Sequence, residues 1–212
     1  MHDSVHWIMV TRKYVQTRRA EQQAETRQRI VEAAVGLHGS VGPARTTFSM
    51  VAERAGVQRH TLYAHFPDER SLLLACSAHH LATEPPPDPA GWAAIRDPEA
   101  RLRAGLGEIY GWFERNAGIF ACVLSDAEHH ALLREVSEMR FGPHFAGWAA
   151  ALGAGEASPA AGAVLALALS FHTWRTLVEG GALTSAAAAA VMAAAVTSAA
   201  AGGADEPARA TA

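Results

Sequence analysis

The sequence predicts an all-α protein, and three observations favour this fold class. Apolar residues recur at helical spacing in several segments, glycine and proline separate these segments, and no segment shows the alternating pattern of a β-strand. The chain has 212 residues, of which half are apolar and 18% are charged. This composition is typical of a folded protein that buries one sizeable core or two small ones.

The first two helices are predicted from their apolar spacing and their end signals. From residue 25 onward, Ile30, Ala34 and Leu37 recur at helical spacing before a group of glycines and a proline. A short second helix begins after Thr47, whose side chain is placed as its N-cap, and ends at Gly56. The second helix is therefore expected to be compact and to be followed by a tight turn.

A third and a fourth helix are predicted directly after this turn. Leu62 is a core position of the third helix, Pro67 ends it, and Asp68 is placed to cap the fourth. Two short helices joined by a glycine turn, the second of which exposes polar and aromatic side chains, are typical of a helix-turn-helix, and its second helix can enter the major groove of DNA. We therefore expect a helix-turn-helix DNA-binding domain at residues 25–83.

The charges are distributed unevenly along the chain. Residues 1–24 lack a sustained apolar period and are expected to form a flexible basic arm. Its basic residues are Arg12, Lys13, Arg18 and Arg19. Residues 1–66 include nine basic and five acidic residues, which gives this segment a net charge of +4. Because the whole chain has a net charge of -3, residues 67–212 carry a net charge of -7. Because phosphate binding depends on the local field, the acidic total does not exclude a DNA-binding function.

The second half of the chain is predicted to be a separate helical domain. The segment EPPPDPAG at 84–91 is too rich in proline to be helical and is expected to be a linker. A regulatory and dimerisation domain is expected at residues 92–201. Its first three predicted helices span 98 to about 116, 118–125 and 127–140, and the third is followed by a break or kink at 142–143 and a further helical turn to 152. Its last two predicted helices span 158 to about 179 and 184 to about 200.

The front segment resembles a known family of regulators. The sequence TTFSMVAERAGVQRHTLYAHFPDERSLLLA is similar to the DNA-binding segment of tetracycline-repressor (TetR) family transcriptional regulators, and the resemblance covers about residues 26–82. It implies a homodimeric regulator that binds double-stranded DNA and responds to a small-molecule effector. The implied contacts to the DNA backbone are Thr47, Tyr63 and His65, and the implied base-facing residues are Arg59, His60, Thr61 and Ala64. Arg59 is suited to guanine, and Ala64 to a thymine methyl group.

The chain departs from the family pattern at two places. Gln58 stands where many relatives have a serine that caps the third helix, which predicts a weaker cap. Glu69 stands where many relatives have a lysine that binds phosphate, so this contact is lost. Either Arg70 or the N-terminal arm is a candidate to replace it.

The second domain is rich in aromatic residues, which favours an internal ligand pocket. The aromatic residues are Tyr110, Trp112, Phe113, Phe120, Phe141, Phe145, Trp148, Phe171 and Trp174. The pocket is predicted to use Trp112, Phe113, Phe120, His130, Phe141, Trp148, His172 and Trp174, with His129, His144 and Arg175 as further polar candidates. Such a lining favours a flat, largely apolar ligand. The alternative is that these aromatic residues only fill a core.

The last two predicted helices, 159–179 and 184–200, are expected to form the dimer interface, because a palindromic site requires two-fold symmetry. The small side chains of Ala186 to Ala195 allow close helix approach. The predicted seam residues are Leu165, Leu169, Trp174, Val191 and Met192. The alternative is that these helices pack only within their own subunit.

Other functions have weaker support in the sequence. A small helical enzyme or metal protein would use Cys122 with histidines such as His129 and His130, but no catalytic motif accompanies them, and no cofactor or metal is expected. The two cysteines form no framework, the N-terminus lacks the order of a signal peptide, and the apolar run at 185–201 is mostly alanine. We therefore expect a cytoplasmic protein without a membrane span.

Overall fold

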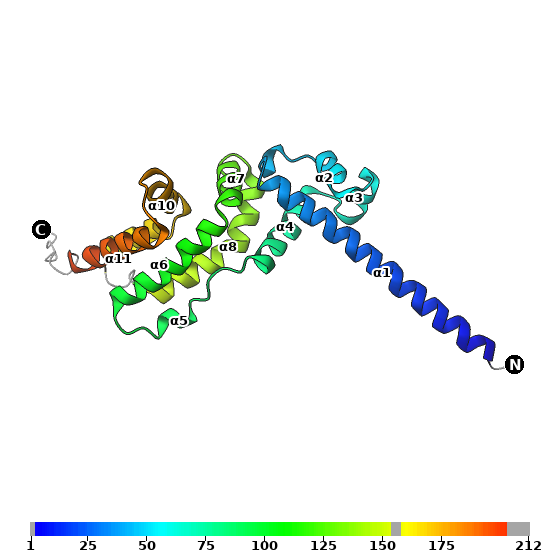
Figure 1. Ribbon diagram of the computed structural model, residues 1–212, viewed down its shortest axis with the longest axis horizontal. Helices are drawn as coiled ribbons and strands as arrows, with labels where there is room; N and C mark the ends of the chain where they lie inside the picture. Colours follow the sequence, from blue (N-terminus) through cyan, green and yellow to red (C-terminus); the bar gives the residue numbers. More distant parts are fainter. Residues whose placement is uncertain (1–2, 154–157, 203–212) are drawn as a thin grey trace, which may run out of the picture.

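The computed structural model describes residues 3–153 and 158–202, with side chains from residue 16 onward, and all regular structure within these residues is helical. The predicted all-α fold is confirmed. Figure 1 shows an elongated molecule in which α2 and α3 lie near one end and α11 lies near the other, with α6 and α8 running between them. Helix α1 projects away from the rest of the molecule towards the N-terminus.

Helix α1 spans Asp3–His38, so the first helix begins well before the predicted start at residue 25, and the flexibility of the basic segment stays a prediction. Residues 3–24 continue the helix, and residues 1–2 lie outside the described part of the chain. The segment from Gln16 to Gln28 consists mainly of Arg, Gln, Glu and Ala, which are good helix formers, so the helix extends from the packed turns that follow. The missing apolar period indicates solvent exposure in this segment, not the absence of a helix.

The DNA-binding domain consists of the C-terminal half of α1 and four further helical segments. They are η1 (Pro43–Arg45), α2 (Phe48–Ala55), α3 (Arg59–His65) and α4 (Glu69–Thr83). The helix ends match the predicted signals. Thr47 accepts a hydrogen bond from the backbone N–H of Met50, Gly56 ends α2 with φ 65°, and Asp68 with Ser71 forms a capping box at α4. The domain encloses its own core around Ile30, Val51, Leu62, Phe66 and Leu72.

The second domain, called the body below, begins with a short helix and three longer ones. They are α5 (Ala90–Ala93), α6 (Pro98–Arg115), α7 (Ala117–Ala127) and α8 (Ala131–Leu152). Helix α8 continues through Pro143, which corrects the predicted break. The residue before a proline usually avoids helical geometry because its Cβ meets the proline ring. Gly142 has no Cβ, so it can keep helical geometry before Pro143 and α8 continues without interruption.

The last part of the body consists of α9 (Pro159–Ala168), α10 (Phe171–Arg175), η3 (Thr176–Gly180) and α11 (Ser185–Gly202). The single helix predicted up to about residue 179 is wrong, because the chain bends by 65° between α9 and α10. Two hydrogen bonds stabilise the bend. The Tyr110 hydroxyl donates to the carbonyl of Ala168 (2.9 Å), and the Ser170 side chain accepts from the N–H of His172 (3.2 Å).

Helix α11 packs on α6 and α9 and closes the main core of the body. Its buried residues are Ala188, Ala189, Ala193 and Val196. It is long and apolar enough to cross a membrane by composition, with 22% of it buried within the chain. Its alanine-rich sequence and its packing on α6 and α9 are those of a helix packed against the body along one side.

The two domains meet mainly where α4 packs against α8. A small apolar cluster of Leu73, Ala127, Leu133 and Val136 lies between them. Two polar contacts border it: Nη1 of Arg70 lies 3.0 Å from Oε2 of Glu135 in an exposed ion pair, and Nε2 of the half-buried His130 lies 3.0 Å from Oε1 of Glu69. The body therefore contacts the DNA-binding domain at the first turn of α4, just after α3.

Candidate nucleic-acid interface and ligand cavity

Helix α3 has one buried side and one exposed side. Leu62 is fully buried, whereas Arg59, His60 and Ala64 are exposed. Tyr63 is 42% exposed, which is unusual for a large aromatic side chain in this protein. Because residues four apart lie on the same face of a helix, the pairs 59/63 and 60/64 form one continuous exposed surface.

Arg59 and Tyr63 contact each other on this surface. Nη2 of Arg59 lies 3.4 Å from the Tyr63 hydroxyl, and the guanidinium lies 5.7 Å from the centre of the tyrosine ring. The other neighbour of Tyr63 is Phe48 of α2, whose ring centre is 5.1 Å away. Tyr63 is thus supported from α2 while its exposed part remains accessible, and Arg59 is held close to it with four of its five N–H donors still unused.

The remaining predicted DNA contacts flank this surface. Thr61 and His65 are half-buried, and Thr47 is exposed at the start of α2, where its Oγ1 accepts a hydrogen bond from Met50 (3.2 Å). A hydroxyl that accepts one hydrogen bond can still donate its proton, so Thr47 can offer an O–H to a phosphate. Thr47 is the N-cap of α2 and the other six predicted residues lie on α3, and their DNA contacts stay a prediction.

The structure shows the surroundings of both residues named in connection with Glu69. Arg70 is bound to the carboxylate of Glu135 through both terminal nitrogens, so in this structure it is engaged with the body. Glu69 faces His130. Gln58 occupies the N-cap position of α3 without a side-chain hydrogen bond, as the sequence predicts. The helical N-terminal segment of α1 remains the candidate source of additional phosphate contacts.

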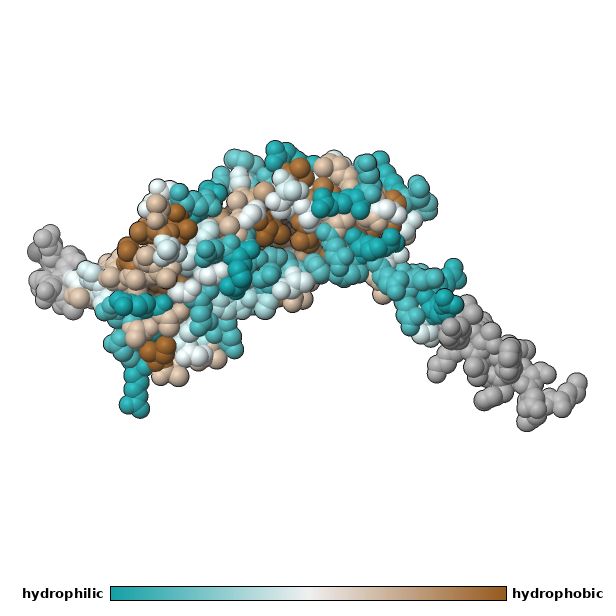
Figure 2. Space-filling view, viewed as in Figure 1, coloured by the Kyte–Doolittle hydropathy of each residue, from teal (hydrophilic) through white to brown (hydrophobic). Residues whose placement is uncertain are grey.

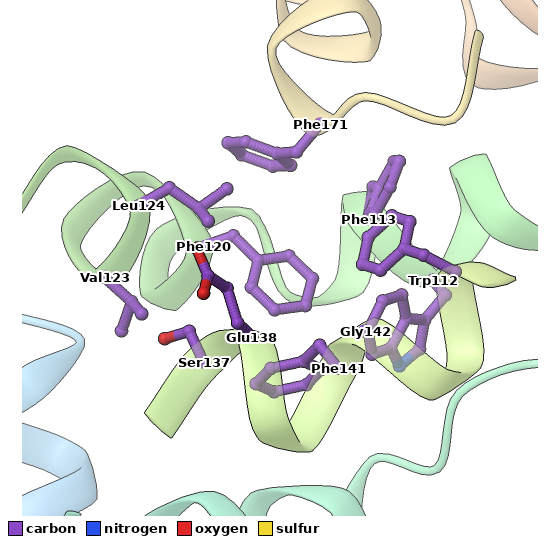
Figure 3. A pocket seen from close by; sticks show the side chains of 11 residues that line it. Trp112, Phe113, Phe120, Val123, Leu124, Ser137, Glu138, Phe141, Gly142 and Phe171 are labelled. Carbon is purple, nitrogen blue, oxygen red and sulfur yellow. The ribbon is translucent and has the colours of Figure 1, made fainter. Parts of the chain in front are cut away.

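The body contains an apolar cavity of about 240 Å³ between α6, α7, α8 and the start of α10 (Figure 3). Its lining residues are Trp112, Phe113, Phe120, Val123, Leu124, Ser137, Glu138, Phe141, Gly142, Phe145 and Phe171. Six of these 11 residues are aromatic, so most of the wall consists of ring faces and edges. Figure 3 shows Phe171 on the opposite side of the cavity from Phe141.

Four of the predicted ligand residues line this cavity, and four do not. Trp112, Phe113, Phe120 and Phe141 belong to the lining. Trp148 is fully buried and supports Trp112 from behind, with ring centres 5.6 Å apart, and Trp174 is buried beside Phe171. These two indoles therefore fill the core.

The two predicted histidines also lie outside the cavity. His130 caps α8 and pairs with Glu69, and His172 is exposed on α10. The other polar candidates, His129, His144 and Arg175, are not part of the lining either. The sequence reasoning missed Glu138 and Gly142, although both share a helical face with Phe141 and Phe145 at the spacing i, i+3, i+4 and i+7.

A smaller cavity of about 50 Å³ lies between the two domains, and it shares Phe120, Val123, Ser137 and Phe141 with the larger one. His38 and His80 line it, and both are buried. Burial lowers the pKa of His38 to about 4 and also lowers the pKa of His80. Both imidazoles are therefore neutral near pH 7, which suits an apolar wall between the domains.

The residues named for the enzyme or metal alternative are not brought together in the described part of the chain. Sγ of Cys122 lies 3.7 Å from the carbonyl oxygen of Gly39, so its described partner is a backbone group and not a histidine. Within residues 3–153 and 158–202, no group of three or more His, Cys, Asp or Glu side chains is placed to hold a metal ion.

Sequence comparison identifies the front domain. Residues 30–76 match the model of the family "Bacterial regulatory proteins, tetR family". An HTH-type regulator of Mycobacterium tuberculosis is 38% identical over 60 residues, and the HTH-type transcriptional regulator TtgR of Pseudomonas putida is 43% identical over 58 residues. The matches cover 28% and 27% of this chain and 32% and 28% of those relatives. The chain thus spans about a third of the length of the curated relatives it matches.

Structural comparison covers most of the chain. A TetR transcription regulator from Haloarcula marismortui has a TM-score of 0.56 at 16% identity and covers 84% of this chain and 98% of its own. A transcriptional regulator from Saccharomonospora viridis, solved in complex with choline, has a TM-score of 0.55 at 16% identity and covers 82% of this chain and 95% of its own. These similarities concern the fold, and the sequence match concerns the DNA-binding domain. Residues 30–76 therefore match the DNA-binding segment of the tetR family of bacterial regulatory proteins, and the chain as a whole shares the fold of the TetR regulators of known structure.

Proposed function

We propose that the protein is a homodimeric transcriptional repressor that binds a palindromic DNA operator through α3 and is released by a small molecule in the body cavity. The observation that carries this proposal is the exposed surface of Arg59, His60, Tyr63 and Ala64 on α3, behind which Leu62 is fully buried. A helix that exposes polar and aromatic groups while its other side is fixed in a core is suited to enter the major groove.

Each exposed side chain has a role in this proposal. Arg59 binds the O6 and N7 atoms of a guanine, Ala64 contacts a thymine methyl group, and Tyr63 and Thr47 bind phosphates. His60 and Thr61 face neighbouring base edges, and His65 contacts the DNA backbone. The net charge of +4 on residues 1–66 supports association with DNA, although the remainder of the chain carries -7.

Binding to DNA fragments that flank the protein's own gene tests this function. Wild type is expected to select a palindromic site whose half-sites are about 34–36 Å apart. Arg59→Ala is expected to weaken binding by about 1–3 kcal/mol and to relax the preference at one base pair. The control is Arg96→Ala, which removes the same charge from an exposed position between α5 and α6. A titration without sequence preference at moderate salt would contradict the proposal.

The position of the cavity supports release by an effector. Ser137, Glu138 and Phe141 line it from α8, and the same helix bears Glu135, which binds α4. The choline bound to the regulator from Saccharomonospora viridis supports a small-molecule site in this fold. An effector with about 100-fold preference for the released geometry supplies ~2.7 kcal/mol, which is enough to empty most operators. The expected setting is the cytoplasm, where the operator and effector are both accessible.

The exposed faces of α9 and α11 support a dimer. Leu167 and Val191 are 59% and 49% exposed, and only 22% of α11 is buried within the chain. Figure 2 shows hydrophobic residues gathered on the surface around α10 and α11, far from the DNA-binding domain. Leu165, Leu169 and Trp174 are buried within the subunit and are therefore not seam residues. The exposed side chains of α9 and α11 take their place in the proposed interface.

A further inference from the structure

The smaller cavity, between the two domains, has in its wall a buried polar atom that lacks a partner. His80 of α4 lines this cavity and is 8% exposed. Its Nε2 atom is buried, and no group in the described part of the chain forms a hydrogen bond with it. The other buried side-chain nitrogens without a partner there belong to Trp92, Arg101 and Arg140, which line neither this cavity nor the aromatic one. A bound group that completes the hydrogen bond of Nε2 would therefore gain affinity at this point.

The position of His80 brings this atom close to the aromatic cavity. Phe120, Val123, Ser137 and Phe141 line both cavities, and Figure 3 shows these four around the larger one. The imidazole of His80 lies against the ring of Phe120, with ring centres 5.9 Å apart and an angle of 79° between the ring planes. The smaller cavity, of about 50 Å³, has room for a hydroxyl group. A ligand in the aromatic cavity can therefore place a small polar group beside His80 by reaching past Phe120.

The surroundings of His80 favour a neutral polar group in the ligand. Burial lowers the pKa of His80, while the carboxylate of Glu84 opposes this shift and the imidazole of His79 adds to it, both to a smaller extent. A neutral imidazole has one nitrogen that donates and one that accepts, and a hydroxyl group can do both. A hydroxyl therefore pairs with Nε2 in either tautomer, whereas a carboxylate would also meet the charge of Glu84. The apolar walls of both cavities disfavour a charged ligand of either sign.

We propose that the two cavities together bind a neutral hydroxyarene, a compound of the phenol class, whose ring lies among the aromatic side chains of the larger cavity and whose hydroxyl forms a hydrogen bond with Nε2 of His80. The inference rests on the proposed effector site. It extends that site from the body to α4 of the DNA-binding domain, and it adds the chemical class of the effector and the residue that recognises its polar group.

A pair of probes that differ by a single hydroxyl group tests this inference. The full-length protein without DNA is injected by calorimetry into solutions of beta-naphthol or of naphthalene, near neutral pH, where the naphthol hydroxyl is protonated. His80→Leu replaces the imidazole by an apolar side chain of similar size. It is expected to weaken binding of the naphthol about tenfold, or about 1.4 kcal/mol, and to change binding of naphthalene less than about twofold.

Two further variants separate the hydrogen bond from a change in the shape of the cavity. His80→Gln keeps a side chain that can donate and accept, so its affinity for the naphthol is expected to be closer to that of wild type than to that of His80→Leu. The control is His79→Leu, the same substitution at the neighbouring position of α4. His79 contacts Gln28 and lines neither cavity, so this variant is expected to bind both probes as wild type does.

The outcomes separate this inference from the proposed repressor function. A loss of affinity that is specific to the naphthol and to His80→Leu, with recovery in His80→Gln, supports the inference. An equal loss for both probes, an equal effect of His79→Leu, unchanged naphthol affinity in His80→Leu, or a naphthol that does not bind to wild type overturns it. Operator binding is measured separately by fluorescence anisotropy. A naphthol that binds through His80 but leaves operator affinity unchanged supports the inference and contradicts release by this site.

Discussion

Arg70 on α4 and Glu135 on α8 form a two-pronged ion pair between the DNA-binding domain and the body, with Nη1 of Arg70 3.0 Å from Oε2 of Glu135. Hydrogen bonding and the charge of Arg70 hold the pKa of the Glu135 carboxyl below its usual value. Both side chains are about half exposed, so the pair contributes little to stability. Glu135 lies on α8, three residues before the cavity-lining residue Glu138. The ion pair is therefore a candidate for transmitting changes in α8 to α4.

Replacing Glu135 by Gln tests this transmission. The variant is expected to change the free energy of unfolding by less than about 1 kcal/mol, because the pair is exposed. It is expected to reduce the coupling between effector and operator binding by roughly 0.5–1 kcal/mol. The coupling is measured as the ratio of operator affinities with and without effector. Glu99→Gln is the control, since it breaks an exposed pair with Arg103 within α6. Equal coupling in both variants and wild type would refute a role for the pair.

The sequence predicted the features of the DNA-binding domain that depend on neighbouring residues. Thr47, Gly56 and Asp68 act at helix ends through hydrogen bonds or backbone angles within a few residues, and the structure has each as predicted. The bend at Ser170 was not predictable in this way. It depends on the Tyr110 hydroxyl, which reaches the Ala168 carbonyl from another helix.

The sequence predicted a cavity with aromatic walls in the body, but only four of the eight predicted ligand residues line it. Aromatic enrichment indicated a site in the body, but sequence spacing does not tell a ring that borders a cavity from one that fills the core behind it. Trp112 and Trp148 illustrate this: their rings touch, yet only Trp112 lines the cavity. Glu138 was available from its helical spacing with Phe141, and the choice of histidines as the polar groups overlooked it.

The buried His38 predicts a loss of stability at acidic pH. Its pKa is about 4 in the folded protein and 6.5 when unperturbed, mainly because burial disfavours the charged form. Between these values the unfolded chain binds more protons than the folded one, so the stability that is fully present above pH 6.5 decreases as the pH falls towards 4. The shift corresponds to ~3 kcal/mol, and His80 acts in the same direction.

Urea unfolding at about pH 7.5 and about pH 5 measures this dependence. His38→Asn removes the titrating group and is expected to have a smaller difference in unfolding free energy between the two conditions than wild type. His129→Asn is the control, because His129 is exposed in the turn between α7 and α8. A pH dependence that is the same in all three proteins would show that His38 titrates normally.

Gly105 is predicted to be a tight packing site of the body core. A Cβ at this position would lie 2.7 Å from Cδ2 of Leu152 and 3.0 Å from the ring of Trp92. Trp92 is 2% exposed and has little room to move. Gly105→Ala is therefore expected to lower the free energy of unfolding by about 1–3 kcal/mol, although alanine is the better helix former.

Gly107 on the same helix supplies the matched control, since a Cβ there would meet no atom within 4 Å. Gly107→Ala is expected to raise the free energy of unfolding by about 0.5–1 kcal/mol, because alanine lowers the entropy of the unfolded chain. Urea unfolding of the two variants beside wild type gives both values. Stabilisation of the protein by Gly105→Ala would mean that α5 and α8 do not pack against α6 as closely as described.

The proposed dimer interface predicts that charge on α9 or α11 separates the subunits. Val191, Ala194 and Ser198 are exposed at helical spacing on α11, and Leu167 is exposed on α9. In a two-fold interface each substituted residue occurs twice, so Leu167→Lys or Val191→Lys introduces two like charges into an apolar contact. Light scattering at micromolar concentration is expected to show monomers for both variants and a dimer for wild type.

A third variant separates loss of the dimer from a general effect of surface charge. Met139 is 49% exposed, as Val191 is, but lies on α8. Met139→Lys is therefore expected to remain dimeric and to keep wild-type operator affinity. The two monomeric variants are expected to bind the palindrome more weakly, because one helix-turn-helix makes too few contacts for tight binding. Monomeric wild-type protein that binds the operator with full affinity would exclude this interface, and it would leave the exposed faces of α9 and α11 available for another partner.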